Sequence, residues 1–185
     1  MIIEVMGRYA GWLALYSGVA GGGDVILLPE IPYDISKICA SILARHRRGK
    51  RFSIVVAAEG ARPKGGRMTV KKVIEKSTDK IRLGGVANIL AKEIEKRTKI
   101  ESRATILGHL QRGGSPSPFD RVLATRYGTE AVELAVRGKF GHMVALKGQD
   151  IVAVPIKDVV NKQKRVPLNH PIIKTARSVG THFGD

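Results

Sequence analysis

The chain has 185 residues, of which 43% are apolar, so it can form one substantial α/β domain or one domain and part of another, and disorder is excluded. Lys and Arg number 32 against 16 Asp and Glu, and the charge of +16 predicts anionic partners: nucleic acid, anionic lipid or phosphorylated metabolites. The single cysteine, Cys39, excludes an intrachain disulfide. Because no signal peptide or membrane-spanning run is found, we expect a soluble, cytoplasmic protein with no membrane partner.

Four short apolar runs predict strands, at residues 2–5, 25–28, 53–57 and 104–107. Helical patterns separate them, at residues 9–20, 34–49 and 85–98. This alternation predicts an α/β fold with a mostly parallel sheet, right-handed crossovers and helices on both faces. The helix at 9–20 is apolar nearly all round, so we expect it to lie between two layers.

The remaining segments have weaker patterns. Residues 62–82 are strongly basic and predict a turn or hairpin, followed by a short element around Val70, Val73 and Ile74. Ser117 begins a sequence typical of a capped helix that runs to residue 137, and two short strands follow at 143–146 and 151–154. The C-terminus is expected to be helical in pieces, interrupted by two prolines, Pro167 and Pro171.

Polar residues follow the predicted strands at the ends where parallel sheets bind ligands. They are Met6-Gly7-Arg8, Glu30, Glu59 and His109 to Arg112. Two arginines, a histidine and one or two carboxylates suit a ligand that carries both a phosphate and hydroxyl groups. Glu30 is interpreted as structural, since an acid beside a proline at a strand end is common.

Three segments resemble the phosphofructokinase family in order and spacing: EVMGR at 4–8, VVAAEG at 55–60 and RATILGHLQRGGSP at 103–116. The likeness covers residues 2 to about 155. It implies a fructose 6-phosphate-binding α/β domain at 1–113, a segment of the larger, donor-binding domain at 114–156, and a C-terminal helical segment at 157–185. It also implies the glycolytic phosphorylation of fructose 6-phosphate.

The resemblance assigns roles to individual residues. Arg8 would stabilise charge on the transferring phosphoryl group, and Glu59 would accept hydrogen bonds from sugar hydroxyls. Arg103 would reach a neighbouring subunit's site in a homo-oligomer, either a dimer or a tetramer. The sugar pocket would be lined by Met6 and Gly7, and the 6-phosphate would be bound by His109 and Arg112. Allosteric members of the family bind a nucleotide or phosphoenolpyruvate at the positions of Gly22, Asp24, Arg48 and Lys50. At the position of Asp24, these members often have an acidic residue with a longer side chain.

The family's donor-binding loop and its catalytic aspartate do not occur in this sequence. The resemblance implies Mg²⁺ and a donor, ATP or pyrophosphate, in the full-length enzyme, with ATP favoured. The chain alone is predicted to bind no metal or donor and to be inactive, because phosphoryl transfer needs metal, donor and nucleophile together.

Two other interpretations remain open. The charge of +16 suggests a nucleic-acid-binding module, but no Phe, Tyr or Trp lies between Phe52 and Phe119, so the basic segment has no stacking platform. We therefore expect no specific nucleic-acid partner. The other alternative is a regulatory subunit or remnant of the family without catalytic activity.

Overall fold

A computed structural model describes residues 1–73 and 81–185. The chain forms two compact units: unit 1 contains Met1–Gln111 and Lys164–Asp185, and unit 2 contains Arg112–Gln163. The sequence-based division placed boundaries after residues 113 and 156. The structure instead returns residues 164–185 to unit 1, so they are not a separate segment.

Unit 1 is built on a four-stranded parallel sheet in the order β2-β3-β1-β6, which confirms the predicted α/β fold. Its strands are β1 (Ile2–Val5), β2 (Val25–Leu27), β3 (Val55–Ala58) and β6 (Ala104–Ile106). Its helices are α1 (Trp12–Ala20), α2 (Ile35–Arg47), α3 (Val86–Thr98) and α5 (Pro171–Ser178), with the 3₁₀ helix η1 (Gly108–Arg112) after β6. In the basic segment, β4 (Val70–Val73) and β5 (Ile81–Leu83) form an antiparallel pair. Ile74 lies outside the described residues.

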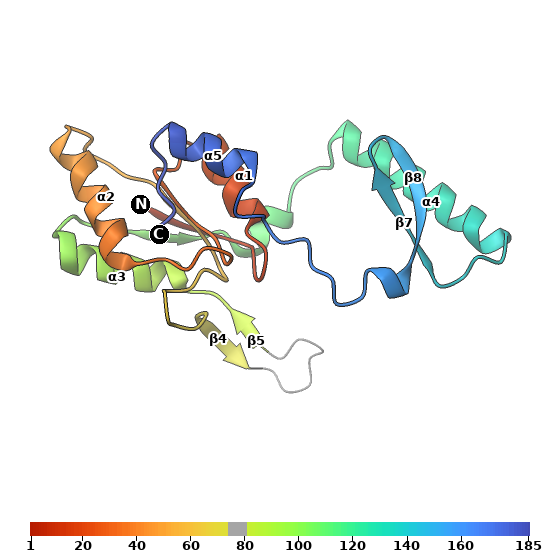
Figure 1. Cartoon of the computed structure of the whole chain (residues 1–185), viewed down its shortest axis with the longest axis horizontal. Helices are drawn as coiled ribbons and strands as arrows, with labels where there is room; N and C mark the ends of the chain where they lie inside the picture. The colour runs from red at the N-terminus through yellow and green to blue at the C-terminus, as the bar shows by residue number, and fades with distance from the viewer. Residues whose placement is uncertain (74–80) are drawn as a thin grey trace. The chain divides into compact units, whose positions relative to one another are not determined.

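Helices cover both faces of this sheet (Figure 1). Side chains alternate along each strand, so a parallel strand buried on both sides contributes to two cores. Val25, Leu27 and Val55 pack with α2 and α3 in one core. Ile26 and Val56 pack with α1 and α5 in the other.

Helix α1 differs from the prediction that it lies between two layers. It buries only Ala14, Leu15 and Gly18, while Leu13 and Tyr16 are about half exposed, at 50% and 53%. Its one buried face packs on β2 and β3. The expectation was wrong because apolar composition measures how much surface favours burial and does not specify how many layers cover it.

The C-terminal residues complete the core beside β2. Pro171 begins α5 at its first turn and does not interrupt a helix, as expected for a residue with no N–H to donate. The chain then pairs with the free edge of β2, where His182 N–H donates to the Asp24 carbonyl (2.9 Å) and Ile26 N–H to the His182 carbonyl (2.9 Å). Phe183 is completely buried among the residues that cover the α1 face.

His182 makes the stability of this C-terminal segment dependent on pH. Burial lowers the pKa of His182, as do the nearby charges of Arg177 and Lys37, while Asp185 raises it. Its Nδ1 accepts a hydrogen bond from the Gly184 N–H (2.8 Å), which requires the neutral ring. As pH falls below the unfolded-state pKa of about 6.5, His182 is protonated in the unfolded chain before it is protonated in the folded chain. Protonation therefore favours the unfolded state.

We therefore expect the contribution of His182 to the free energy of unfolding to be full above about pH 6.5 and to decrease below it. Urea unfolding of the wild type and of His182→Gln at about pH 5 to 8 measures this contribution. The difference between the two proteins should change mainly below about pH 6.5. A difference that is constant with pH would contradict the assignment.

Unit 2 contains α4 (Pro118–Val136), the antiparallel strands β7 (His142–Lys147) and β8 (Asp150–Pro155), and the 3₁₀ helix η2 (Ile156–Asp158). The predicted cap is confirmed: Ser117 Oγ accepts from the Asp120 N–H (3.2 Å), and the Asp120 carboxylate accepts from the Ser117 N–H (2.9 Å).

Unit 2 does not form a core of its own. Leu134 is its one buried residue, and a helix with a single hairpin buries too little apolar surface to be stable alone. Its large exposed apolar residues include Phe119, Val122, Val132, Val136, Phe140 and Val160. Much of the apolar surface of unit 2 is therefore not buried within unit 2 itself. In the described part of the chain, no helix is long and apolar enough to cross a membrane.

Candidate functional site

The carboxyl ends of β1, β3 and β6 border a cavity of about 380 Å³ within unit 1. Three residues predicted from the sequence line it: Met6 after β1, Glu59 after β3 and His109 in η1. Backbone of Gly84, Gly85 and Gly108 and the side chain of Asn88 complete much of the lining. Residues separated by more than 100 positions in the sequence thus meet at one site.

Strand register explains why these residues meet. Val5 of β1 is opposite Ala58 of β3, and Glu4 of β1 is opposite Ile106 of β6. The ladder continues past the β3 end, where the Glu59 N–H donates to the Val5 carbonyl (2.9 Å). Because parallel strands end at the same sheet edge, the residues that follow them become neighbours.

Gln111 fixes η1 to the end of β1. Its side-chain Oε1 accepts a hydrogen bond from the Met6 N–H at 2.7 Å. This bond holds the turn that carries His109 against the segment that begins with Met6. Sequence reasoning missed Gln111, although it lies between His109 and Arg112 in the longest motif, because a neutral amide gives no chemical signal of its own.

Glu4 is a buried acid at the floor of the cavity, and its side chain caps α3. It is only 2% exposed, and its carboxylate accepts hydrogen bonds from the Gly85 N–H (2.9 and 3.0 Å) and the Ala87 N–H (2.9 Å). A carboxylate at a helix N-terminus satisfies free N–H groups and interacts favourably with the helix dipole. The signal for this role was an acid inside an apolar strand, which was not interpreted.

Replacing Glu4 with glutamine should lower the free energy of unfolding by about 1–3 kcal/mol, because an amide cannot satisfy both N–H groups as the carboxylate does. Urea unfolding followed by Trp12 fluorescence measures the change. Glu101→Gln is the matched control: Glu101 is exposed and pairs only with exposed Arg103 among the described residues, so its loss should cost less than about 0.5 kcal/mol. Equal effects of the two exchanges would contradict the capping role.

The predicted arginines lie at different places. Arg8 follows Gly7 at the end of β1, with its guanidinium 5.1 Å from the centre of the Tyr9 ring, within cation–π range. Arg103 precedes β6, at the opposite end of that strand from His109, and forms an exposed ion pair with Glu101 at 2.7 Å. Arg112 is exposed and is the first residue of unit 2.

Among the described residues, the predicted effector positions lie in different places. Gly22 and Asp24 line a cavity of about 160 Å³ together with Arg45, whereas Lys50 lines another and Arg48 is the C-cap of α2. Asp24 has a structural role: its carboxylate pairs with Arg45 (2.7 Å) and accepts from the Ile54 N–H (2.8 Å). Glu30 is also structural, as interpreted, since it accepts from the N–H groups of Gly11 (3.1 Å) and Val166 (2.8 Å).

The described residues do not form a metal site. Among residues 1–73 and 81–185, no three His, Cys, Asp or Glu side chains come together as ligands would.

The fold of this chain is that of a known protein family. Residues 1–135 match the family model for phosphofructokinase, and the chain belongs to that family, as the motifs predicted. An ATP-dependent 6-phosphofructokinase of Spirochaeta thermophila is 54% identical over 185 residues, all of this chain and 50% of that protein. A pyrophosphate–fructose 6-phosphate 1-phosphotransferase of Streptomyces coelicolor is 52% identical over 166 residues, 90% of this chain and 48% of that protein.

Solved structures show the same fold. The pyrophosphate-dependent phosphofructokinase of Marinobacter aquaeolei matches with a TM-score of 0.73 and 26% identity, covering all of this chain and 48% of that one. The phosphofructokinase of Saccharomyces cerevisiae matches 86% of this chain, with a TM-score of 0.68 and 34% identity. This chain spans about half the length of the curated relatives it matches.

Proposed function

We propose that this chain is the sugar-phosphate-binding part of a 6-phosphofructokinase that phosphorylates fructose 6-phosphate in glycolysis, in the cytoplasm. The observation that carries the proposal is the meeting of Met6, Glu59 and His109 around one cavity at the carboxyl edge of the sheet. These residues come from three separate segments, and all three segments carry the family's motifs. A cavity of about 380 Å³ is within the usual range for a small-molecule ligand.

Each residue has a role that its chemistry supports. The Glu59 carboxylate accepts hydrogen bonds from sugar hydroxyls, and His109 with Arg112 binds the 6-phosphate through charge-assisted hydrogen bonds. Arg8 stabilises the negative charge of the phosphoryl group during transfer. Met6 and Gly7 shape the pocket beside the sugar. Arg103, at the far end of β6, reaches the site of a neighbouring subunit in a homo-oligomer.

The phosphoryl donor and its Mg²⁺ belong to the part of the enzyme that this chain does not contain. Two observations support this division: the chain matches half of its relatives, and unit 2 does not bury its large apolar residues within itself. Donor loop, metal and catalytic base would come from the missing half, so the chain alone is inactive. ATP is the favoured donor, and the similarity to the Streptomyces coelicolor relative supports pyrophosphate as the alternative.

An amide-resolved NMR titration of the full chain with fructose 6-phosphate tests the binding site. We expect shifts at Met6, Glu59, Gly108 and His109, and weaker binding by Glu59→Gln. Glu93→Gln is the control, because Glu93 is only partly buried on α3, pairs with Arg97 and lies outside the cavity lining. The proposal fails if the sugar phosphate shifts none of these amides while duplex DNA binds at physiological salt.

An activity assay tests the division of the enzyme. The purified chain with fructose 6-phosphate, Mg²⁺ and either ATP or pyrophosphate should form no fructose 1,6-bisphosphate. Co-expression with the half of the Spirochaeta thermophila relative that this chain does not match should restore phosphoryl transfer to fructose 6-phosphate. Assays with ATP and with pyrophosphate, run separately, then identify the donor. Product formation by the chain alone would contradict the proposed division.

In the reconstituted enzyme, two arginine variants should affect different kinetic parameters. Arg112→Ala should raise the KM for the sugar phosphate by about tenfold or more, because it removes a charged contact remote from the reacting atoms. Arg8→Ala should lower kcat by about 10²-fold or more, because its contact strengthens in the transition state. Steady-state kinetics separates the two, and the reverse pattern would show that the roles are exchanged.

A further inference from the structure

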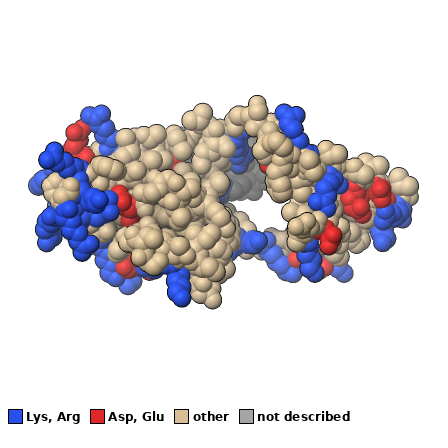
Figure 2. Space-filling model, turned by 90° about the horizontal axis from the view of Figure 1, so that it is seen from above, with Lys and Arg blue, Asp and Glu red and all other residues tan. Residues whose placement is uncertain are grey.

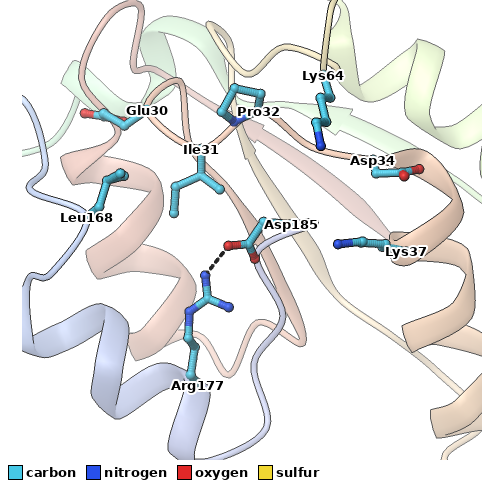
Figure 3. A pocket seen from close by; sticks show the side chains of 10 residues that line it. Glu30, Ile31, Pro32, Asp34, Lys37, Lys64, Leu168, Arg177 and Asp185 are labelled. Carbon is cyan, nitrogen blue, oxygen red and sulfur yellow. Dashed lines mark hydrogen bonds and ion pairs between the residues drawn. The ribbon is translucent and has the colours of Figure 1, made fainter.

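A second cavity, of about 450 Å³, lies in unit 1 beyond the carboxyl ends of β2 and β3. It shares no lining residue with the cavity at Met6, Glu59 and His109. Its residues come from the segment after β2, the first turn of α2, the loop after β3 and the C-terminal segment (Figure 3). Its volume is within the range of small-molecule sites.

The lining divides into an apolar wall and a set of cations. Ile31, Pro32 and Leu168 form the apolar wall. Lys37 on α2, Lys64 after β3 and Arg177 on α5 supply positive charge from three different elements. Figure 3 shows Lys37 and Lys64 extending into the cavity from these separate segments.

The carboxylates of the lining already have partners. Glu30 accepts from the N–H groups of Gly11 and Val166, and Asp34 accepts from the Ser36 N–H at 2.8 Å as the N-cap of α2. Asp185 pairs with Arg177 at 2.6 Å. In contrast, neither Lys37 nor Lys64 takes part in any ion pair found in the described part of the chain. The Ser36 N–H and the charge of Lys37 lower the pKa of Asp34, so Lys37 also interacts with an acid of the lining. Lys37 and Lys64 are thus the cations of the lining that can also reach a ligand, since Arg177 is held in its ion pair with Asp185.

The walls of the cavity are fixed by backbone contacts. The Asp34 N–H donates to the Gly184 carbonyl (2.7 Å), and the Lys64 N–H donates to the Tyr33 carbonyl (2.8 Å). Gly184 has φ +81°, and a Cβ at this position would lie 2.7 Å from Tyr33 Cβ, so the C-terminal segment is closely packed there. A site that is already formed loses little conformational entropy on binding.

We propose that this cavity binds a small organic anion with one phosphate or carboxylate group and an apolar body. The anionic group lies between Lys37 and Lys64. The apolar body lies against Ile31, Pro32 and Leu168. This site is independent of the proposed function.

Phenyl phosphate is the probe that carries both features. In an amide-resolved NMR titration of the full chain, it should shift Ile31, Lys37 and Gly184 with a dissociation constant on the order of 1 mM, as expected for a ligand of this size. Inorganic phosphate and phenol, each with one feature, should bind at least about fivefold more weakly. Benzoate distinguishes a carboxylate from a phosphate, and binding of either anion supports the proposal.

A double variant, Lys37→Met with Lys64→Met, should weaken phenyl phosphate binding by at least about fivefold, while its fold is preserved because both side chains are exposed. Lys174→Met is the matched control: Lys174 is exposed on α5 outside the cavity lining, and its loss should leave binding unchanged.

Three results would each overturn the proposal: no shift at Ile31, Lys37 and Gly184, unchanged binding in the double variant, or inorganic phosphate binding as tightly as phenyl phosphate. Shifts confined to Met6, Glu59 and His109 would place the probe in the other cavity and would also overturn it.

Discussion

Replacing Gly60 with alanine is expected to lower the free energy of unfolding by about 3 kcal/mol or more, the upper range for overpacking a closed site. A Cβ at Gly60 would lie 1.8 Å from the Arg8 carbonyl oxygen and 2.9 Å from the Gly7 carbonyl oxygen. Both contacts are with backbone, so no side chain can rotate away. The Gly60 N–H also donates to the Gly7 carbonyl at 3.0 Å, which holds the two segments together.

Urea unfolding followed by the fluorescence of Trp12, the chain's single tryptophan, measures this loss. Trp12 reports on unit 1, since its Nε1 donates to the Lys164 carbonyl at 2.6 Å. Gly128→Ala is the matched control, because no atom lies within 4 Å of its added Cβ, and it should leave the Trp12 transition unchanged. If Gly60→Ala unfolds like the wild type, the close approach of the β1 and β3 ends is wrong.

The same exchange should affect the candidate site. Gly60 joins Glu59 to the turn at Gly7 and Arg8, so displacing that backbone moves two predicted substrate contacts relative to one another. Where Gly60→Ala remains folded at low temperature, we expect its fructose 6-phosphate titration to show weaker shifts at Glu59 than the wild type. A variant that is destabilised but binds equally well would separate the fold of this turn from the function proposed for it.

Phe183→Ala is expected to cost about 3–5 kcal/mol, the usual range for truncating a buried aromatic side chain. Phe183 is completely buried, and the Arg177 guanidinium lies 4.9 Å from the centre of its ring. Its removal leaves a cavity beneath α5 and beside β2, where the C-terminal segment pairs with the sheet. The C-terminal segment should therefore become the least protected part of unit 1 in amide hydrogen exchange.

Two exposed phenylalanines serve as controls. Phe119 and Phe140 in unit 2 are 67% and 75% exposed, so their truncation should change the free energy of unfolding by less than about 0.5 kcal/mol. Thermal unfolding of the three variants gives the comparison. A small effect of Phe183→Ala would mean that residues 164–185 pack only loosely on unit 1, contrary to the structure.

The positive net charge of the chain does not by itself describe the candidate site. On the face drawn in Figure 2, Lys and Arg are more widespread than Asp and Glu, in keeping with the charge of +16. The cavity at Met6, Glu59 and His109, however, contains two carboxylates, Glu4 and Glu59. The composition predicted an anionic partner, but the arrangement of the lining residues is what favours a ligand with hydroxyl groups as well as a phosphate.

The sequence alone determined the elements of the parallel sheet and the residues that follow its strands. Apolar runs and helix caps have local causes, such as the Asp34 and Ser117 caps, so β1, β2, β3, β6 and α2 to α4 were predictable within a few residues. The candidate site was predictable for the same reason: once strands are parallel, Met6, Glu59 and His109 must share an edge.

Only the tertiary structure decided the contacts between segments far apart in the sequence. Glu4 caps α3 across 81 and 83 residues, Gln111 binds the Met6 N–H across 105, and His182 pairs with β2 at the far end of the chain. The sequence around Glu4, Gln111 and His182 has no pattern that predicts these contacts. Their hydrogen-bond partners come close only when distant segments pack together in the folded chain. The motifs therefore predicted where a ligand would bind, whereas only the folded structure revealed the groups that hold this candidate site in place.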